Sequence, residues 1–216
     1  EKMPKAPSMK DLASNGGDGQ PPRETESPET TVPQLEPPSR SLATFEAKSG
    51  LYSVRYPDNW QAAEGSDGVA VTFVPRGGVI QTNEGNHIVY GILVNRFDPT
   101  EKSYDGRATS SGPFRGRSTL ERRANLLVAD IVENNRYLEA DPSTVREVQI
   151  AEGRGLVISL SGPNPTTQEK ENVTLAIRDL YDGTMLYFLF VTPEKDVQQL
   201  GQTFRTVLTS LRVEAR

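Results

Sequence analysis

His87 is the only histidine in the chain, and histidine is the side chain that most readily exchanges a proton near neutral pH. A zinc peptidase helix requires H-E-x-x-H, and no such motif is present. A Ser-His-Asp triad on a hydrolase fold would require a G-x-S-x-G elbow, which is also absent. We therefore interpret His87 as a surface or strand-end residue.

Paired carboxylates could act as acid and base or as ion ligands. They occur at Asp179 with Asp182 and at Glu169 with Glu171. Neither pair has the D-x-D-x-D-G spacing of a calcium loop. We assign Asp182 to a tight turn and Glu169 to Glu171 to an exposed loop. The glycines form no phosphate-binding loop. The sequence thus indicates no catalytic residue, no metal site and no cofactor, and we expect that this chain is not an enzyme.

Arginines gather around a long polar connection, residues 98–117, and the helix start that follows it. The cluster consists of Arg107, Arg115, Arg117, Arg122 and Arg123. One interpretation is a site for an anion or an acidic partner, for which we select Arg107, Arg115, Arg117 and Arg122. The alternative is a solvated face, because Asp105 and Glu121 dilute the positive charge.

The overall charge argues against nucleic acid as a partner. The chain carries 24 Lys and Arg against 29 Asp and Glu, for a net charge of −5 without blocks of one sign. Phosphate binding requires clustered positive charge. The absence of cysteine excludes disulfides and thiol catalysis but leaves the compartment open. No apolar run approaches the length of a membrane span.

The first part of the chain differs in composition from the rest. Eight of the 16 prolines precede Ser41, and the first aromatic residue is Phe45. A segment without aromatic anchors cannot bury enough apolar area to offset roughly 1–2 kcal/mol per residue of backbone ordering. We predict a disordered Pro-rich linker over 1–43 and one domain over 44–216. Because the chain opens on Glu1, we expect it to be a piece of a longer protein.

The segment Met185–Leu211 organises the predicted domain. Seven apolar residues, Met185–Val191, follow an Asp182-Gly183 turn and predict a buried central strand. Thr192 and Pro193 then predict a capped helix start, and apolar residues recur at helical spacing up to Leu211. One stripe of that helix must therefore lie on the sheet.

The remaining elements follow the same patterns. Ser118 and Glu121 fit a capping box that opens a second helix, which ends near Asn134. Further strands are expected at 42–48, 51–56, 68–75, 87–97, 144–150, 155–161 and 172–181. Trp60 is expected to fold back into the core. Short turns between consecutive strands predict antiparallel pairing. The fold class is therefore α+β, a mainly antiparallel sheet covered by helices.

Three local signatures suggest a family. They are Tyr52-x-Val54-x-Tyr56-Pro57-x-Asn59-Trp60; Val71-x-Phe73-x-Pro75-x-Gly77-Gly78 running into His87-x-x-Tyr90-Gly91; and Phe188-x-Phe190-x-x-Pro193 followed by Phe204-x-x-Val207-Leu208-x-Ser210-Leu211. These resemble the PsbP-like α/β/α sandwich. More specifically, they resemble the C-terminal extension of bacterial zinc metallopeptidases of the CAAX-prenyl-protease (Ste-type) family. In those proteins a catalytic domain and a Pro-rich linker come first.

The resemblance implies a companion domain rather than a protease, because the zinc-binding helix is absent from this chain. It leads us to expect a non-catalytic accessory domain, the C-terminal part of a zinc metallopeptidase in a bacterial periplasm or cell envelope. Its partner would be another protein or the covalently linked peptidase domain. A cytoplasmic location stays open. Two alternatives also stay open: a free-standing secreted or lipid-anchored protein that binds an anionic ligand or partner, and a carboxylate-based enzyme of unrecognised class.

Overall fold

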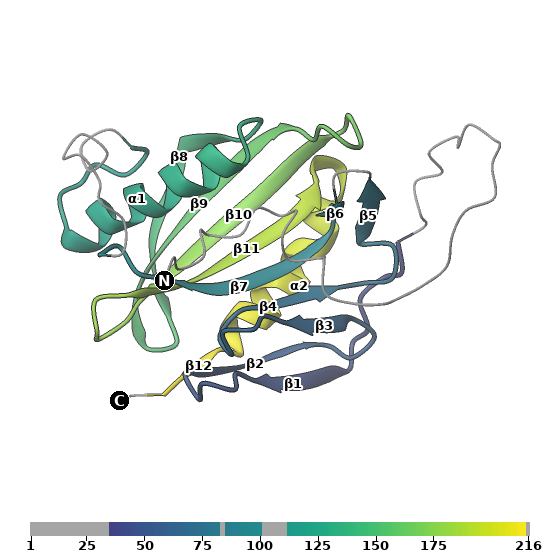
Figure 1. Cartoon of the computed structure of the whole chain (residues 1–216), viewed down its shortest axis with the longest axis horizontal. Helices are drawn as coiled ribbons and strands as arrows, with labels where there is room; N and C mark the ends of the chain where they lie inside the picture. The colour runs from purple at the N-terminus through teal and green to yellow at the C-terminus, as the bar shows by residue number, and fades with distance from the viewer. Residues whose placement is uncertain (1–34, 83–84, 101–111, 215–216) are drawn as a thin grey trace.

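The computed structural model describes residues 35–82, 85–100 and 112–214 (Figure 1). Its elements are β1 (Leu42–Glu46), β2 (Tyr52–Pro57), β3 (Gln61–Glu64), β4 (Val71–Val74), β5 (Val79–Thr82), β6 (Gly85–Ile88), β7 (Gly91–Phe97), α1 (Thr119–Asn134), β8 (Glu139–Ile150), β9 (Gly153–Pro163), β10 (Lys170–Asp179), β11 (Met185–Pro193), a 3-10 turn (Glu194–Asp196), α2 (Val197–Thr209) and β12 (Arg212–Val213).

The described residues form three sheets, and every strand pair in them is antiparallel. The largest has the order β3-β4-β7-β11-β10-β9-β8, so β11 lies at its centre and β8 at one edge. A smaller sheet has the order β1-β2-β12, and β5 with β6 forms a separate hairpin. The predicted α+β class with a mainly antiparallel sheet is confirmed.

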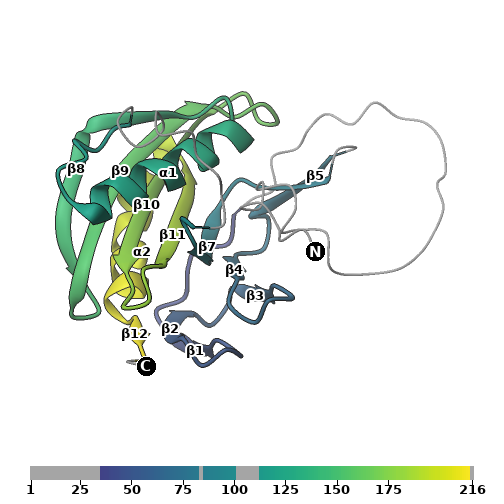
Figure 2. The same ribbon diagram turned by 60° about the vertical axis from the view of Figure 1, so that its left-hand side comes forward.

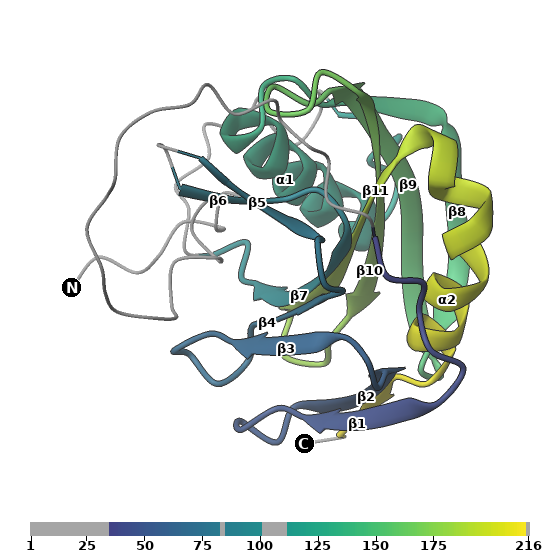
Figure 3. The same cartoon turned by 90° about the vertical axis from the view of Figure 1, so that its right-hand side faces the viewer.

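The central strand β11 is buried on both faces, which explains its unbroken apolar run. Its odd-numbered residues, from Met185 to Val191, lie in a core layer with α1. Its even-numbered residues, from Leu186 to Phe190, lie in a second layer with α2, β1 and β2. Figures 2 and 3 accordingly show α1 and α2 on opposite sides of the seven-stranded sheet.

Helix α1 begins as the sequence predicts. The Ser118 hydroxyl accepts a hydrogen bond from the Glu121 amide at 3.1 Å, and the Glu121 carboxylate accepts one from the Ser118 amide at 3.1 Å. This capping box satisfies two amides that the helix itself leaves unpaired. The helix buries Leu120, Leu127 and Ile131 against the sheet. Its position is therefore encoded locally and fixed by packing.

Several sequence-based boundaries are wrong. Thr192 lies inside β11, and α2 begins at Val197 after a 3-10 turn, without a side-chain cap. The predicted strand 87–97 is divided into β6 and β7, because the amides of Val89 and Tyr90 both donate to the Gly78 carbonyl. The alternation rule also missed the short strands β3 and β12, whose sequences carry too few apolar residues to show a period.

The predicted linker boundary at 43/44 falls inside β1. Residues 35–41, which the sequence assigned to the linker, are also in contact with the domain. The Asn59 side chain accepts from the Ser39 amide at 2.8 Å and donates to the Pro37 carbonyl at 2.9 Å. Residues 1–34 lie outside the described part of the chain, so the rest of the predicted linker stays a prediction.

Candidate functional site

A groove with a volume of about 970 Å³ lies at one end of the described structure. It lies between the turn that joins β8 to β9, the end of α2, and the small sheet. Its walls are formed by Thr44, Ser53, Val54, Arg55, Gln149, Ile150, Ala151, Glu152 and the run Leu208–Glu214. The groove is therefore bordered by strands at the edges of two different sheets.

One wall is the free edge of β8, the last strand of the seven-stranded sheet. Ile150 pairs with Gly153 across a two-residue turn, and Val148 pairs with Gly155. In an antiparallel pair, residues alternate between facing the partner strand and facing away from it. The residue between them, Gln149, therefore directs its backbone N–H and C=O away from β9, on the edge that borders the groove.

The opposite wall is β12, which ends the order β1-β2-β12. The Glu214 amide donates to the Leu51 carbonyl at 3.0 Å, and Arg212 pairs with Ser53. By the same alternation, Val213 directs its backbone polar groups away from β2. Beyond β12, the Arg55 amide of β2 donates to the Ser210 hydroxyl at 2.8 Å, so this position of β2 is already hydrogen-bonded. Only a short stretch of this edge is left open to a partner.

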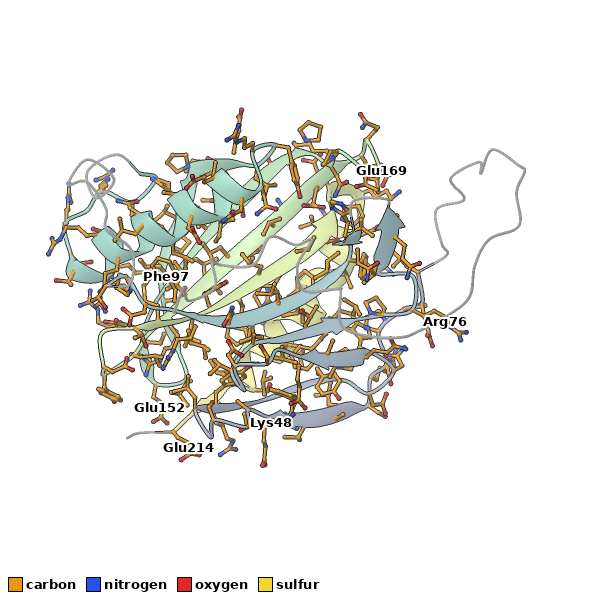
Figure 4. The ribbon with its side chains drawn as sticks, in the orientation of Figure 1. Lys48, Arg76, Phe97, Glu152, Glu169 and Glu214 are labelled. Carbon is orange, nitrogen blue, oxygen red and sulfur yellow. The ribbon has the colours of Figure 1, made fainter. Side chains whose placement is uncertain are left out.

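Charges of both signs surround the groove. Arg55, Arg212, Glu152 and Glu214 are all exposed. Figure 4 shows Glu152 and Glu214 at the same end of the molecule, where the turn between β8 and β9 approaches the end of the chain. The surface is suited to a polar peptide of mixed charge rather than to an apolar ligand.

The turn between β8 and β9 has a strained backbone. Its two residues, Ala151 and Glu152, have φ angles of 47° and 63°, and neither is glycine. Such a turn normally contains Asn-Gly or Asp-Gly, and left-handed non-glycine residues cost of order 1 kcal/mol each. The strained residues line the groove.

The structure describes three of the four arginines selected from the sequence, and these lie near the start of α1. Arg107 lies outside the described residues. Arg115, Arg117 and Arg122 are exposed, and Arg122 donates to the Gly116 carbonyl and the Thr119 hydroxyl, both at 3.2 Å, near its own helix start. Arg123 instead pairs with Asp179 at 3.0 Å and ties α1 to the turn after β10. Partner binding by Arg107, Arg115, Arg117 and Arg122 stays a prediction.

Glu171 was assigned to an exposed loop, and this is wrong: its side chain is 1 % exposed. It shares one face of β10 with Val173, Leu175 and Ile177, a period-two pattern that the sequence already contained. The Tyr137 hydroxyl donates to Glu171 Oε1 at 2.8 Å, and Asn164 Nδ2 donates to Oε2 at 2.6 Å. Burial raises the pKa of Glu171 from 4.5 to about 7, although both hydrogen bonds act to lower the pKa.

The other candidate groups are dispersed. His87 lies half-buried in the β5–β6 hairpin. Asp182 accepts from the amide and hydroxyl of Thr184 at 2.9 and 2.7 Å, as expected of a turn residue. Within residues 35–82, 85–100 and 112–214, no three His, Cys, Asp or Glu side chains are placed to hold a metal ion. No helix in the same ranges is long and apolar enough to cross a membrane.

Gln149 and Val213 carry no side-chain signal in the sequence that marks them as functional residues. What distinguishes these residues is the direction of their backbone groups, which depends on strand pairing between distant segments. The only local indication was the apolar pair Leu211 and Val213 directly after the helix, which is compatible with a further short strand.

No family model and no curated protein sequence matches this chain. Solved structures do. A cyanobacterial PsbP (CyanoP) from Synechocystis aligns over 81% of this chain and 93% of its own, with 12% identity and a TM-score of 0.51. LpqN of Mycobacterium tuberculosis, described as involved in cell envelope biogenesis, aligns over 81% and 91%, with 7% identity and a TM-score of 0.42. The alignment with the cyanobacterial protein shows that this chain has a PsbP-like α+β fold.

Proposed function

We propose that this domain is a non-catalytic protein-binding module and that it takes an extended segment of a partner into the groove between β8 and β12. The observation that carries the proposal is the pair of outward-facing strand edges at Gln149 and Val213, on opposite walls of the groove of about 970 Å³. Exposed strand edges bind peptides by adding a strand, in which main-chain hydrogen bonds supply much of the affinity. The mixed charges of Arg55, Arg212, Glu152 and Glu214 favour a polar segment of mixed charge.

A display library of random heptapeptides, selected on the full chain, tests this proposal. Selected peptides should bind Gln149→Pro and Val213→Pro at least about tenfold more weakly, because proline removes the N–H that faces the peptide. Glu147→Pro is the matched control. Glu147 pairs with Leu156 and faces outward on the same edge of β8, but it does not line the groove. Equal binding to all three variants and to the unaltered chain would refute docking at these edges.

The finer part of the proposal is that this domain is the C-terminal part of a zinc metallopeptidase of a bacterial cell envelope, whose catalytic domain is not in this chain. It rests on the resemblance given above and not on the alignments with solved structures. Determining the coding sequence upstream of Glu1 tests it. An H-E-x-x-H motif followed by the Pro-rich segment would support it, and a start codon nearby without that motif would remove the peptidase association.

A carboxylate-based enzyme is less well supported. Glu171 has the raised pKa that such an enzyme uses, and Glu169 lies near it. However, each carboxylate oxygen of Glu171 already accepts a hydrogen bond from the protein. The small void that residue Glu171 helps to line is about 40 Å³, room for only a few water molecules. These contacts favour a structural role for Glu171.

A further inference from the structure

The open edge of β12 carries charges in a fixed order. Arg212 pairs with Ser53, and the Glu214 amide donates to the Leu51 carbonyl, so both residues lie in register with β2. Successive residues of a strand point to opposite faces of its sheet. Arg212 and Glu214 therefore project from one face, and Val213 between them projects from the other. Both charged side chains are exposed, and both line the groove.

The two faces of β12 differ in character. Val213 packs against the core layer that contains α2, to which the groove residues Ile150 and Leu208 also belong. The other face is polar, since Arg212 lies opposite Ser53. A strand that adds to this edge therefore has one side turned to the apolar core layer and one side turned to charged residues and water.

Neighbouring charges of the groove repeat the same order. Arg55 follows Ser53 by two residues on β2, so it is a diagonal neighbour of Arg212 on the same face, at roughly 7–8 Å. Glu152 lies at the same end of the molecule as Glu214 (Figure 4). Among the described residues, the ion pairs include none of these four charged side chains. The groove thus has a negative end near Glu214 and a positive part near Arg212.

Val213 fixes the register of an added strand, because its N–H and C=O are the backbone groups that face the groove. An antiparallel partner gives the more stable ladder, and its residue opposite Val213 exchanges both hydrogen bonds with it. That residue points to the same side as Val213, toward the core layer that contains α2. Its two neighbours stand opposite Arg212 and Glu214. Since an antiparallel partner runs against β12, the neighbour opposite Glu214 comes first in the partner's sequence.

We propose that the groove recognises an extended partner segment with the order basic, apolar, acidic. The apolar residue pairs with Val213, the basic residue lies opposite Glu214, and the acidic residue lies opposite Arg212. Directly opposite side chains have Cβ atoms roughly 4.5–5.5 Å apart, so both ion pairs can form. Arg55 adds a second positive charge on the side of the acidic residue. This inference rests on the proposed strand addition and adds the charge order of the partner.

Selection of random heptapeptides on the full chain tests the charge order. Peptides selected on the unaltered chain should be enriched in Lys or Arg, followed by an apolar residue and then by Asp or Glu. The double variant Arg212→Glu with Glu214→Arg should select the order acidic, apolar, basic, because the two charges change places while the net charge stays the same. Arg205→Glu is the control. Arg205 is exposed on α2 outside the groove, so this variant should select the same order as the unaltered chain.

A double-mutant cycle measures the ion pair at Arg212. Replacing the acidic residue of a selected peptide by its amide should weaken binding to the unaltered chain about fivefold, as expected for a well-placed exposed ion pair. The same replacement should change binding to Arg212→Gln by less than about twofold, because the cycle isolates the interaction between the two side chains.

Two kinds of failure are distinguishable. Peptides that bind the groove without a preferred charge order, or with the same order on the double variant, would overturn this inference and leave the strand addition standing. The reverse order on the unaltered chain would also overturn it, because that order fits a parallel strand. Failure to recover any peptide, or peptides that bind Gln149→Pro and Val213→Pro as tightly as the unaltered chain, would refute the proposed function, and the charge order with it.

Discussion

Two regions at opposite ends of the molecule differ in how their polar groups are paired. At the Glu171 end, a buried carboxylate accepts hydrogen bonds from Tyr137 and Asn164. At the other end, the backbone of Gln149 and Val213 faces a groove of about 970 Å³. In the first region the polar groups are buried and hydrogen-bonded, as in a protein interior. In the second region they lie on strand edges to which a further strand could pair.

This difference indicates where stability and binding are located. Buried polar groups are costly unless they are fully paired, so the Glu171 end should respond strongly to substitution and to pH. An exposed strand edge is a site at which another chain can pair, and natural proteins usually cover or shorten such edges. The edge of β12 is short, but the backbone polar groups of Val213 on this edge still face the groove.

The largest expected effect is at Gly162, which pairs with Glu171. A Cβ atom there would lie 1.7 Å from the Tyr137 carbonyl oxygen, so the backbone itself must move. Gly162→Ala should lower the free energy of unfolding by about 3 kcal/mol or more, measured by urea denaturation. Gly201→Ala in α2 is the matched control. It has nothing within 4 Å and should raise stability by about 0.5–1 kcal/mol. A mild effect at Gly162 would mean that this end is loosely packed.

The next effect is the pH dependence of stability. Since the pKa of Glu171 is raised from 4.5 to about 7 on folding, the folded chain binds the extra proton. The stabilisation of the fold by this proton is therefore fully present below pH 4.5 and is lost as the pH rises through about 7. We expect a loss of roughly 3 kcal/mol over this window, because the shift of about 2.5 pKa units corresponds to about 1.4 kcal/mol per unit.

Glu171→Gln should remove this pH dependence, whereas Glu169→Gln, at a half-exposed position, should retain it. Chemical denaturation at several pH values provides the measurement. If Glu171→Gln keeps the slope of the unaltered chain, another group is responsible, and the buried carboxylate is not the origin of the effect.

A smaller effect is expected at the open end. Replacing Ala151-Glu152 with Asn-Gly should raise the free energy of unfolding by about 1 kcal/mol, because both residues have positive φ. The melting temperature should rise accordingly. A destabilised double variant would show that Ala151 or Glu152 makes contacts that outweigh the relieved strain.

The sequence predicted the parts of this fold that depend on local pattern. The double-sided burial of Met185–Val191, the capping box at Ser118 and the antiparallel meander are confirmed. It did not predict the groove, because Gln149 and Val213 are brought together by segments far apart in the chain. Glu171 was missed for another reason: its charge suggested a surface position, although its alternation with Val173 and Leu175 indicated the core.

Amide hydrogen exchange along β8 tests the open edge most directly. We predict that the amides of Val148 and Ile150 are protected, because they face β9, and that the Gln149 amide between them exchanges rapidly. On β12 the Glu214 amide should exchange more slowly than that of Val213. Equal protection of Val148, Gln149 and Ile150 in the free chain would show that the edge is already covered, and would contradict a binding groove at this end of the sheet.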